Sequence, residues 1–262
     1  MRKDSPMRVI LVAVALCLVC SVLVSAAAVV LRPEQELNKA LDKKKNILLA
    51  AGLIEPKGEA DIDAVYTERV EARLVDLETG EYTDAFPVDA FDQRDAAKDP
   101  AQSIEIPDKE DPAGIGRRSL YAPVYLVRES PGSNEFSGVI IPVHGKGLWS
   151  TLYGFLALDS DLNTIEGLGF YEHAETPGLG GEVDNPNWKA QWKGKQVYED
   201  GKVEISVIKG KVNPNSPDKA YEIDGIAGAT ITARGVSNLV QYWMGSGAFQ
   251  TYITRVREQG LS

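Results

Sequence analysis

Hydrophobic residues are unevenly distributed along the chain, and the longest apolar run lies near its start. No charged residue occurs between Val9 and Leu31. A helix rises about 1.5 Å per residue, so a run of this length crosses a hydrocarbon core of about 30 Å. The pattern predicts one transmembrane helix at residues 9–31, preceded by a short segment, residues 1–8.

The next ninety residues have a mixed pattern. Pro33 is expected to open a second helix that ends near Gly52, because apolar residues recur at helical spacing between them. A short helix is predicted at residues 61–70, a strand at 72–77 and a turn at 78–80. Residues 84–116 are rich in Asp, Pro and Ala, which predicts an irregular, exposed stretch.

After residue 120 the pattern changes to short β-rich runs. Strands are predicted at residues 121–127, 138–143, 152–158, 165–171 and 203–208, and helices at 231–244 and 249–258. Strands grouped together with helices at the ends indicate an α+β fold. We therefore expect a membrane-proximal region at residues 32–120 and a ligand-binding domain at residues 121–262.

The apolar run could also be a cleaved signal peptide, since residues 25–28 offer small side chains of the cleavage type. A signal peptide core has about 7–15 apolar residues. This run is longer, which favours a retained anchor. Arg2, Lys3 and Arg8 precede it, and the positive-inside rule then places the N-terminus in the cytoplasm and the rest of the chain outside.

Composition excludes several classes of function. Asp and Glu number 38 against 28 Lys and Arg, a net charge of -10, which argues against a nucleic-acid partner. Cys17 and Cys20 both lie in the apolar run, so the rest of the chain has neither a disulfide nor a cysteine-ligated cluster. His144 and His173 lack a ligand constellation around them, so no metal site is predicted. Redox chemistry outside the membrane would need an organic cofactor.

The segment from Asp224 to Thr230 carries the clearest chemical signal. Gly225, Ala227, Gly228 and Ala229 keep the backbone free to approach a ligand. Thr230 follows at the expected start of a helix, where free N–H groups and the helix dipole favour a phosphate. The simpler alternative is a glycine-containing loop that leads into a helix capped by Thr230.

This segment resembles the flavinylation motif of the FMN-binding domain family that includes the NqrC subunits of the Na+-translocating NADH:quinone oxidoreductase. In that family a flavin transferase cleaves FAD and leaves FMN joined through its phosphate to the last hydroxyl of the motif. The resemblance implies that Thr230 carries the FMN. Members commonly have Ser or Thr where this chain has Ala227, a departure that leaves the attachment hydroxyl unchanged.

Two other loops match the same family. Residues 175–182 read Glu-Thr-Pro-Gly-Leu-Gly-Gly-Glu and resemble the family's flavin-pocket loop, and residues 142–150 resemble a loop that lies by the flavin. Trp149 is either an apolar wall for the ring or a core residue. The candidate cofactor-binding residues are therefore Thr230, Asp224, Gly225, Ala227, Gly228, Ala229, Glu175, Thr176, Gly178, Leu179, Gly180, Gly145 and Trp149.

Other enzyme classes find no support in the sequence. No G-x-S-x-G motif is present, and no G-x-G-x-x-G follows a strand, so neither a hydrolase triad nor a dinucleotide site is expected. We predict no catalytic acid, base or nucleophile. The flavin would receive its electrons from another protein.

The resemblance implies a role for the whole chain. It would be a bacterial inner-membrane protein, with its main domain in the periplasm, that relays electrons from NADH toward ubiquinone while Na+ is exported. Its partners would be subunits A, B, D, E and F of the complex, and the flavin transferase during maturation. Two alternatives remain open: RnfG of the related Rnf electron-transport complex, whose members generally lack the segment at about residues 34–120, and an anchored binding or assembly protein without a cofactor.

Overall fold

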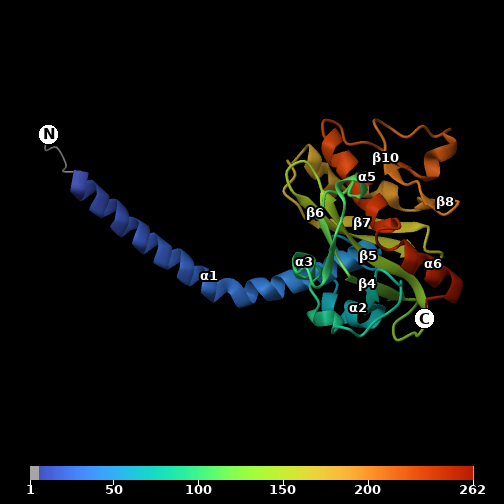
Figure 1. The fold of residues 1–262 in the computed structure, drawn as a ribbon, viewed down its shortest axis with the longest axis horizontal. Coiled ribbons are helices and arrows are strands. Elements are labelled where there is room, and N and C mark those ends of the chain that lie inside the picture. The colour runs from blue at the N-terminus through green and yellow to red at the C-terminus, as the bar shows by residue number, and fades with distance from the viewer. Residues whose placement is uncertain (1–5, 262) are drawn as a thin grey trace. The chain divides into compact units, whose positions relative to one another are not determined.

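The computed structural model describes residues 6–261, and the chain divides into an N-terminal helical unit that ends at Lys43 and a compact unit that begins at Lys44 (Figure 1). Helix α1 (Pro6–Ala50) contains the predicted membrane span. It is long and apolar enough to cross a membrane, and none of its apolar window is buried in the protein. The prediction of a second helix after Pro33 is wrong, because Pro33 lies inside α1. The helix continues to Ala50 although proline has no backbone N–H to donate at that position.

The compact unit is built on a five-stranded antiparallel sheet. Its strands, in spatial order, are β1 (Val70–Asp76), β4 (Tyr121–Arg128), β5 (Phe136–Lys146), β6 (Thr151–Asp159) and β7 (Ile165–Glu172). The predicted strands at 72–77, 121–127, 138–143, 152–158 and 165–171 are confirmed. Because β1 belongs to this sheet, the predicted division at residue 120 does not correspond to a division of the fold.

Both faces of the sheet are covered. One face packs against α5 (Thr230–Met244) and α6 (Gln250–Gln259), which confirms the two predicted C-terminal helices. The other face packs against Ile47 and Leu48 near the end of α1 and against α2 (Ile62–Arg69), the predicted short helix. Strand residues alternate between the two faces, so each strand contributes to both apolar layers.

The connecting segments hold more structure than the sequence indicates. The composition of residues 84–116 predicts an irregular, exposed stretch, yet Ala96, Ile106 and Ala113 are buried there. The predicted strand at 203–208 is confirmed only in part. Two short strands, Lys202–Val203 and Ser206–Val207, cover some of it, and Ile205 between them turns into the core. The short elements are η1 (Val88–Ala90), α3 (Gln93–Lys98), β2 (Ser103–Glu105), η2 (Asp108–Glu110), β3 (Arg117–Ser119), η3 (Gly180–Asp184), α4 (Pro186–Lys189), η4 (Ala190–Trp192), β8 (Tyr198–Glu199), β9 (Lys202–Val203), β10 (Ser206–Val207), η5 (Pro217–Ala220) and β11 (Glu222–Ile223).

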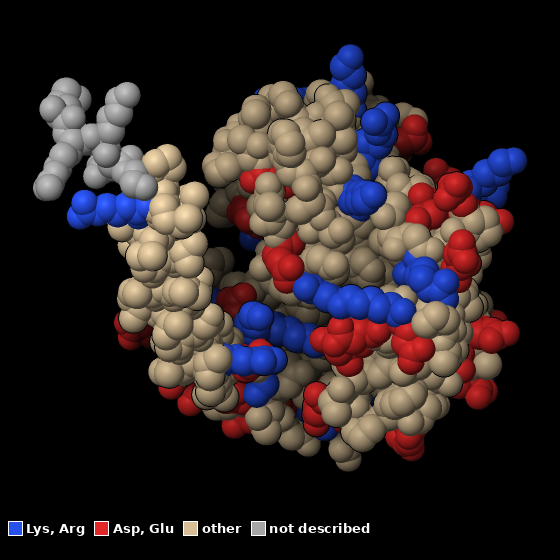
Figure 2. Space-filling model, turned by 60° about the vertical axis from the view of Figure 1, so that its left-hand side comes forward, with Lys and Arg blue, Asp and Glu red and all other residues tan. Residues whose placement is uncertain are grey.

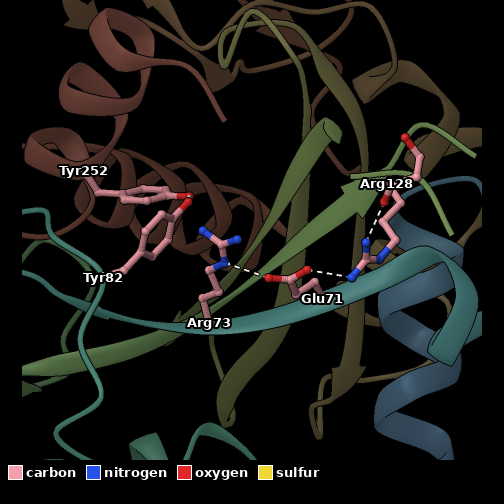
Figure 3. Close-up of polar contacts among 6 residues, drawn as sticks. Glu71, Arg73, Tyr82, Arg128 and Tyr252 are labelled. Carbon is pink, nitrogen blue, oxygen red and sulfur yellow. Dashed lines mark hydrogen bonds and ion pairs between the residues drawn. The ribbon is translucent and has the colours of Figure 1, made fainter. Parts of the chain in front are cut away.

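A polar cluster joins the edge strand β1 to β4 (Figure 3). The Glu71 carboxylate lies between two guanidinium groups, 2.8 Å from Arg73 Nε and 2.6 Å from Arg128 Nη2. The Arg73 guanidinium also lies over the Tyr82 ring, and the Tyr82 hydroxyl is 3.0 Å from that of Tyr252 on α6. The Glu71 carboxylate thus pairs with two half-buried guanidinium groups near the sheet edge. Substituting any one member of this cluster would leave the opposite charge partly buried and unpaired, which is destabilising.

On the face of the compact unit shown in Figure 2, acidic and basic side chains lie intermixed. The excess of acidic residues therefore does not produce a uniformly negative surface on this face. A nucleic acid, which needs a continuous basic surface, finds none on this face.

His144 is held neutral inside the fold. Its ring stacks on Tyr153 at 5.3 Å and lies 4.7 Å from Trp243, measured between ring centroids. Burial, and then the charge of Arg94, lower the pKa of His144 from 6.5 to about 4.

This environment predicts a loss of stability in mild acid. Below pH 6.5 the unfolded chain protonates His144 while the folded chain does not, until the pH approaches 4. The free energy of unfolding therefore falls across that window, by at most about 3 kcal/mol from this residue. His144→Phe keeps the stack and should flatten the curve, as measured by urea denaturation at several pH values. Equal slopes in the two proteins would contradict this account.

Candidate functional site

Thr230 begins helix α5, as the sequence predicts. Gly228 turns the chain with φ +74, and the Ala229 carbonyl accepts the first helical hydrogen bond, from the Ala233 N–H at 2.9 Å. The N–H groups of the first turn come before that bond in the chain and have no carbonyl partner within the helix. Among residues 6–261 no side chain caps this helix end. An exposed hydroxyl thus stands at the positive end of a helix dipole, which suits a phosphate.

Thr232 lies two residues further and points the other way. Residues two apart on a helix are about 200° apart around its axis. The Thr230 side chain is exposed, whereas Thr232 is fully buried and its hydroxyl donates to Glu175 Oε2 at 2.5 Å. The fold therefore gives the two hydroxyls different environments.

Glu175 connects its own loop to the loop after β5 and to helix α5. Its second carboxylate oxygen, Oε1, accepts the backbone N–H groups of Trp149 at 2.9 Å and Ser150 at 3.3 Å. The side chain is only 5% exposed. A buried carboxylate is tolerated when its lone pairs are satisfied, and here donors come from a loop after β5 and from α5. This carboxylate thus ties the 175–182 loop to the 142–150 loop and to α5, the helix that follows residues 224–230.

The loop from Glu175 to Gly181 is a tight turn against this carboxylate. The Thr176 carbonyl accepts N–H groups from Leu179 and Gly181, and Gly178 has φ +76. A Cβ on Gly180 would lie 2.6 Å from both Glu175 Oε2 and Thr232 Oγ1, so only glycine fits. The other side of the loop faces the attachment motif, since a Cβ on Gly228 would lie 3.0 Å from Leu179 Cδ2.

Exposed apolar side chains gather on these loops. Leu148, Trp149, Leu179 and Ile231 are 48%, 69%, 45% and 47% exposed. In the described part of the compact unit, Ile104 is the one other large hydrophobic residue with comparable exposure. We call these four residues the apolar patch. The interpretation of Trp149 as a core residue is wrong, because its ring stands in solvent.

Gly145 has a packing role in this structure. It is buried, and a Cβ there would lie 2.6 Å from Leu239 Cβ on α5. Gly235 on α5, which the sequence analysis did not single out, faces the same strand end. A Cβ added to Gly235 would lie 2.4 Å from the Lys146 carbonyl oxygen. These glycines let α5 lie against the end of β5.

Asp224 and Gly225 fix the approach to the motif. The Asp224 carboxylate accepts the Val212 N–H at 2.8 Å, and its carbonyl accepts the Trp188 indole N–H at 2.8 Å. Gly225 donates its N–H to the Gly210 carbonyl at 2.7 Å. Ala227 and Gly228 are exposed, while Ala229 is buried. The acidic residue of the motif therefore braces the loop that leads to Thr230.

Arg234 is a further residue that the sequence reading missed. It lies four positions after Thr230 on α5, is exposed, and has no ion pair assigned to it within residues 6–261. Residues four apart share a helix face. The i, i+4 spacing from Thr230 was the signal that could have identified it as a cation beside an anion held at Thr230.

The arrangement suits a ligand with a phosphate and a flat apolar ring. A phosphate would be bound at the start of α5, with the Arg234 side chain on the same helix face. A flat ring would pack against the apolar patch. Two cavities, of about 580 and 490 Å3, lie elsewhere and are lined by residues of β1 and of the 104–112 segment among others. Within residues 6–261, which the structure describes, no group of three His, Cys, Asp or Glu side chains could hold a metal ion.

Comparison with known proteins identifies similar chains. The family model of the FMN-binding domain matches residues 147–245. The NqrC subunit of the Na(+)-translocating NADH-quinone reductase from Pseudomonas aeruginosa is 48% identical over 258 residues, covering 98% of both chains. Its counterpart from Yersinia pestis is 42% identical over 261 residues, covering 99% of this chain and 96% of that one.

Two crystal structures share the fold. NqrC from Shewanella oneidensis has a TM-score of 0.76 at 36% identity, covering 84% of this chain and 99% of the other. The corresponding protein of the Na(+)-translocating NADH-quinone reductase from Parabacteroides distasonis has a TM-score of 0.66 at 29% identity, covering 86% of this chain and 97% of the other.

Proposed function

We propose that this chain, which belongs to the NqrC family of the Na+-translocating NADH-quinone reductase, holds FMN through a phosphoester on Thr230 and relays electrons within that reductase. The observation that carries the proposal is the exposed Thr230 hydroxyl at the uncapped start of α5, beside the apolar patch. The match of residues 147–245 to the FMN-binding domain supports the choice of cofactor.

The chain's own residues bind and orient the cofactor. FMN, when bound, supplies the redox chemistry by taking up and giving back electrons. Thr230 holds the phosphate, the first turn of α5 and Arg234 offset its charge, and the apolar patch excludes water from one side of the ring. No residue here is assigned as a catalytic acid or base.

Its partners follow from the family. The relatives are named as subunits of a multisubunit reductase. We assign subunits A, B, D, E and F as partners, with NADH oxidised elsewhere in the complex, ubiquinone as the final acceptor and Na+ export coupled to the electron flow. A flavin transferase that uses FAD as donor would attach the cofactor.

Assignment to the NqrC family is favoured over the two alternatives. The similarity to the Pseudomonas aeruginosa protein covers 98% of both chains, so it includes residues 34–120, which RnfG generally lacks. The match of residues 147–245 to the FMN-binding domain argues against a cofactor-free binding or assembly protein, and the flavin content of the purified protein tests this alternative directly.

Removing the Thr230 hydroxyl should remove the cofactor. Thr230→Ala, co-produced with the transferase, should lose all covalent flavin, because no other exposed hydroxyl occupies this helix end. Intact mass and in-gel fluorescence after denaturation measure the loss. Thr230→Ser keeps the hydroxyl and should retain part of the label. Wild-type protein that carries FMN on a residue other than Thr230 would refute the assignment.

The positive-inside rule places the compact unit in the periplasm. Asn134→Cys adds an exposed thiol in the turn between β4 and β5, whereas Cys17 and Cys20 lie in the apolar window. A membrane-impermeant maleimide should label Asn134→Cys in intact spheroplasts and leave the unsubstituted protein unlabelled. Labelling that occurs only after lysis would place the compact unit in the cytoplasm.

The ring contact can be tested apart from the attachment. Leu179→Asp puts a charge into the apolar patch and should alter the flavin absorbance spectrum and reduction potential, while covalent loading stays near the wild-type level. Leu179→Met, of similar volume, is the control and should change neither. A spectrum and potential unchanged in Leu179→Asp would show that this loop does not face the ring.

A further inference from the structure

Two threonines near the start of α5 are chemically able to accept the proposed FMN phosphoester. Thr230 and Thr232 are two residues apart, and both carry the hydroxyl that a phosphoester needs. In the proposed attachment, the threonine Oγ bonds to the FMN phosphorus of FAD while the P–O–P bond breaks. AMP leaves, and the hydroxyl proton passes to a base of the transferase or to solvent. Since either hydroxyl balances this reaction, chemistry alone does not select Thr230.

Thr232 has the more activated hydroxyl of the two. It donates to the Glu175 carboxylate at 2.5 Å, an arrangement that raises the electron density on oxygen. Yet its side chain is fully buried, beneath Gly180 and Glu175. An incoming dinucleotide cannot reach that oxygen, so access decides the outcome and activation does not.

Glu175 is the residue that maintains this burial. Its carboxylate holds Thr232 with one oxygen and the backbone of Trp149 and Ser150 with the other. A carboxylate is the side chain that accepts from three donors without offering a proton of its own. An amide in its place would turn an NH2 group toward an N–H or O–H donor.

We propose that Glu175 is a positioning residue that selects the acceptor: it keeps the Thr232 hydroxyl buried and occupied, so that flavin is attached to Thr230 alone. The inference rests on the proposed function, because it presumes flavinylation at this helix. It assigns Glu175 no contact with the flavin. The family resemblance places Glu175 in a pocket loop, and the hydrogen bonds in this structure give it this different task.

The test uses the full-length chain, co-produced in membranes with the transferase and mapped by peptide mass. In Thr230→Ala, FMN on the Thr232 peptide should stay at the background of the peptide mapping, because Glu175 still covers that hydroxyl. In Thr230→Ala/Glu175→Ala, FMN on the Thr232 peptide should rise at least about tenfold above the Thr230→Ala background, the factor expected from losing one charge-assisted hydrogen bond. Thr230→Ala/Glu175→Gln should show a smaller rise, since the amide retains one acceptor oxygen.

Two controls complete the set. Adding Thr232→Val to Thr230→Ala/Glu175→Ala should abolish the new label. Glu172 lies three positions earlier in the sequence, is exposed and pairs with Arg94, so Thr230→Ala/Glu172→Ala should remain unlabelled at Thr232. Circular dichroism of each variant shows whether it is folded, and if the Glu175→Ala variant is not, the Glu175→Gln variant decides.

The outcomes separate the two proposals. FMN absent from Thr230 in the wild type would refute the proposed function itself. FMN on Thr232 in Thr230→Ala, with Glu175 intact, would overturn acceptor selection and leave the proposed function standing. So would a folded Glu175 variant in the Thr230→Ala background that carries no more label on Thr232 than Thr230→Ala does.

Discussion

One buried carboxylate determines how the candidate site is arranged. Glu175 is the only acidic residue among the buried side chains of the described chain, residues 6–261. Burying an ionised group is costly unless donors satisfy it, and Glu175 draws its donors from Trp149, Ser150 and Thr232. Those donors belong to segments far apart in the sequence. The need to satisfy this one side chain therefore fixes the positions of its own loop, the loop after β5 and the start of α5 relative to one another.

The space around that carboxylate explains the glycines of the motifs. Cβ atoms on Gly147 and Gly180 would lie 2.5 and 2.6 Å from its oxygens. Gly235 in turn lets α5 approach the backbone at the end of β5. In this structure these glycines serve close packing around Glu175 and α5, and the exposed face of the site is left to Thr230, Arg234 and the apolar patch.

The sequence predicts the sheet and the C-terminal helices well, because period-two and helical patterns are local signals. It predicts residues 84–116 and 203–208 poorly, since Ile106 and Ile205 are buried by contacts with distant segments. The motif loops are found through family resemblance. What the sequence does not show is which side chains share a hydrogen bond. In the sequence, Thr232 is a second threonine two residues after Thr230, and Glu175 is one loop residue among several.

The proposed covalent link explains why the site lies on an open surface. A cofactor held without a covalent bond needs a pocket, typically about 300–1,000 Å3, that buries most of it. Here Thr230 and the four residues of the apolar patch are exposed. Attachment through the phosphate removes the need for enclosure, because dissociation no longer has to be opposed by burial. In the proposed arrangement the ring lies at the surface, open to close approach by a partner's redox centre. An electron relay needs that access, whereas an enzyme that binds its own substrate needs a closed site. A docked ring and an approaching partner would cover these apolar side chains, whose exposure to water is unfavourable.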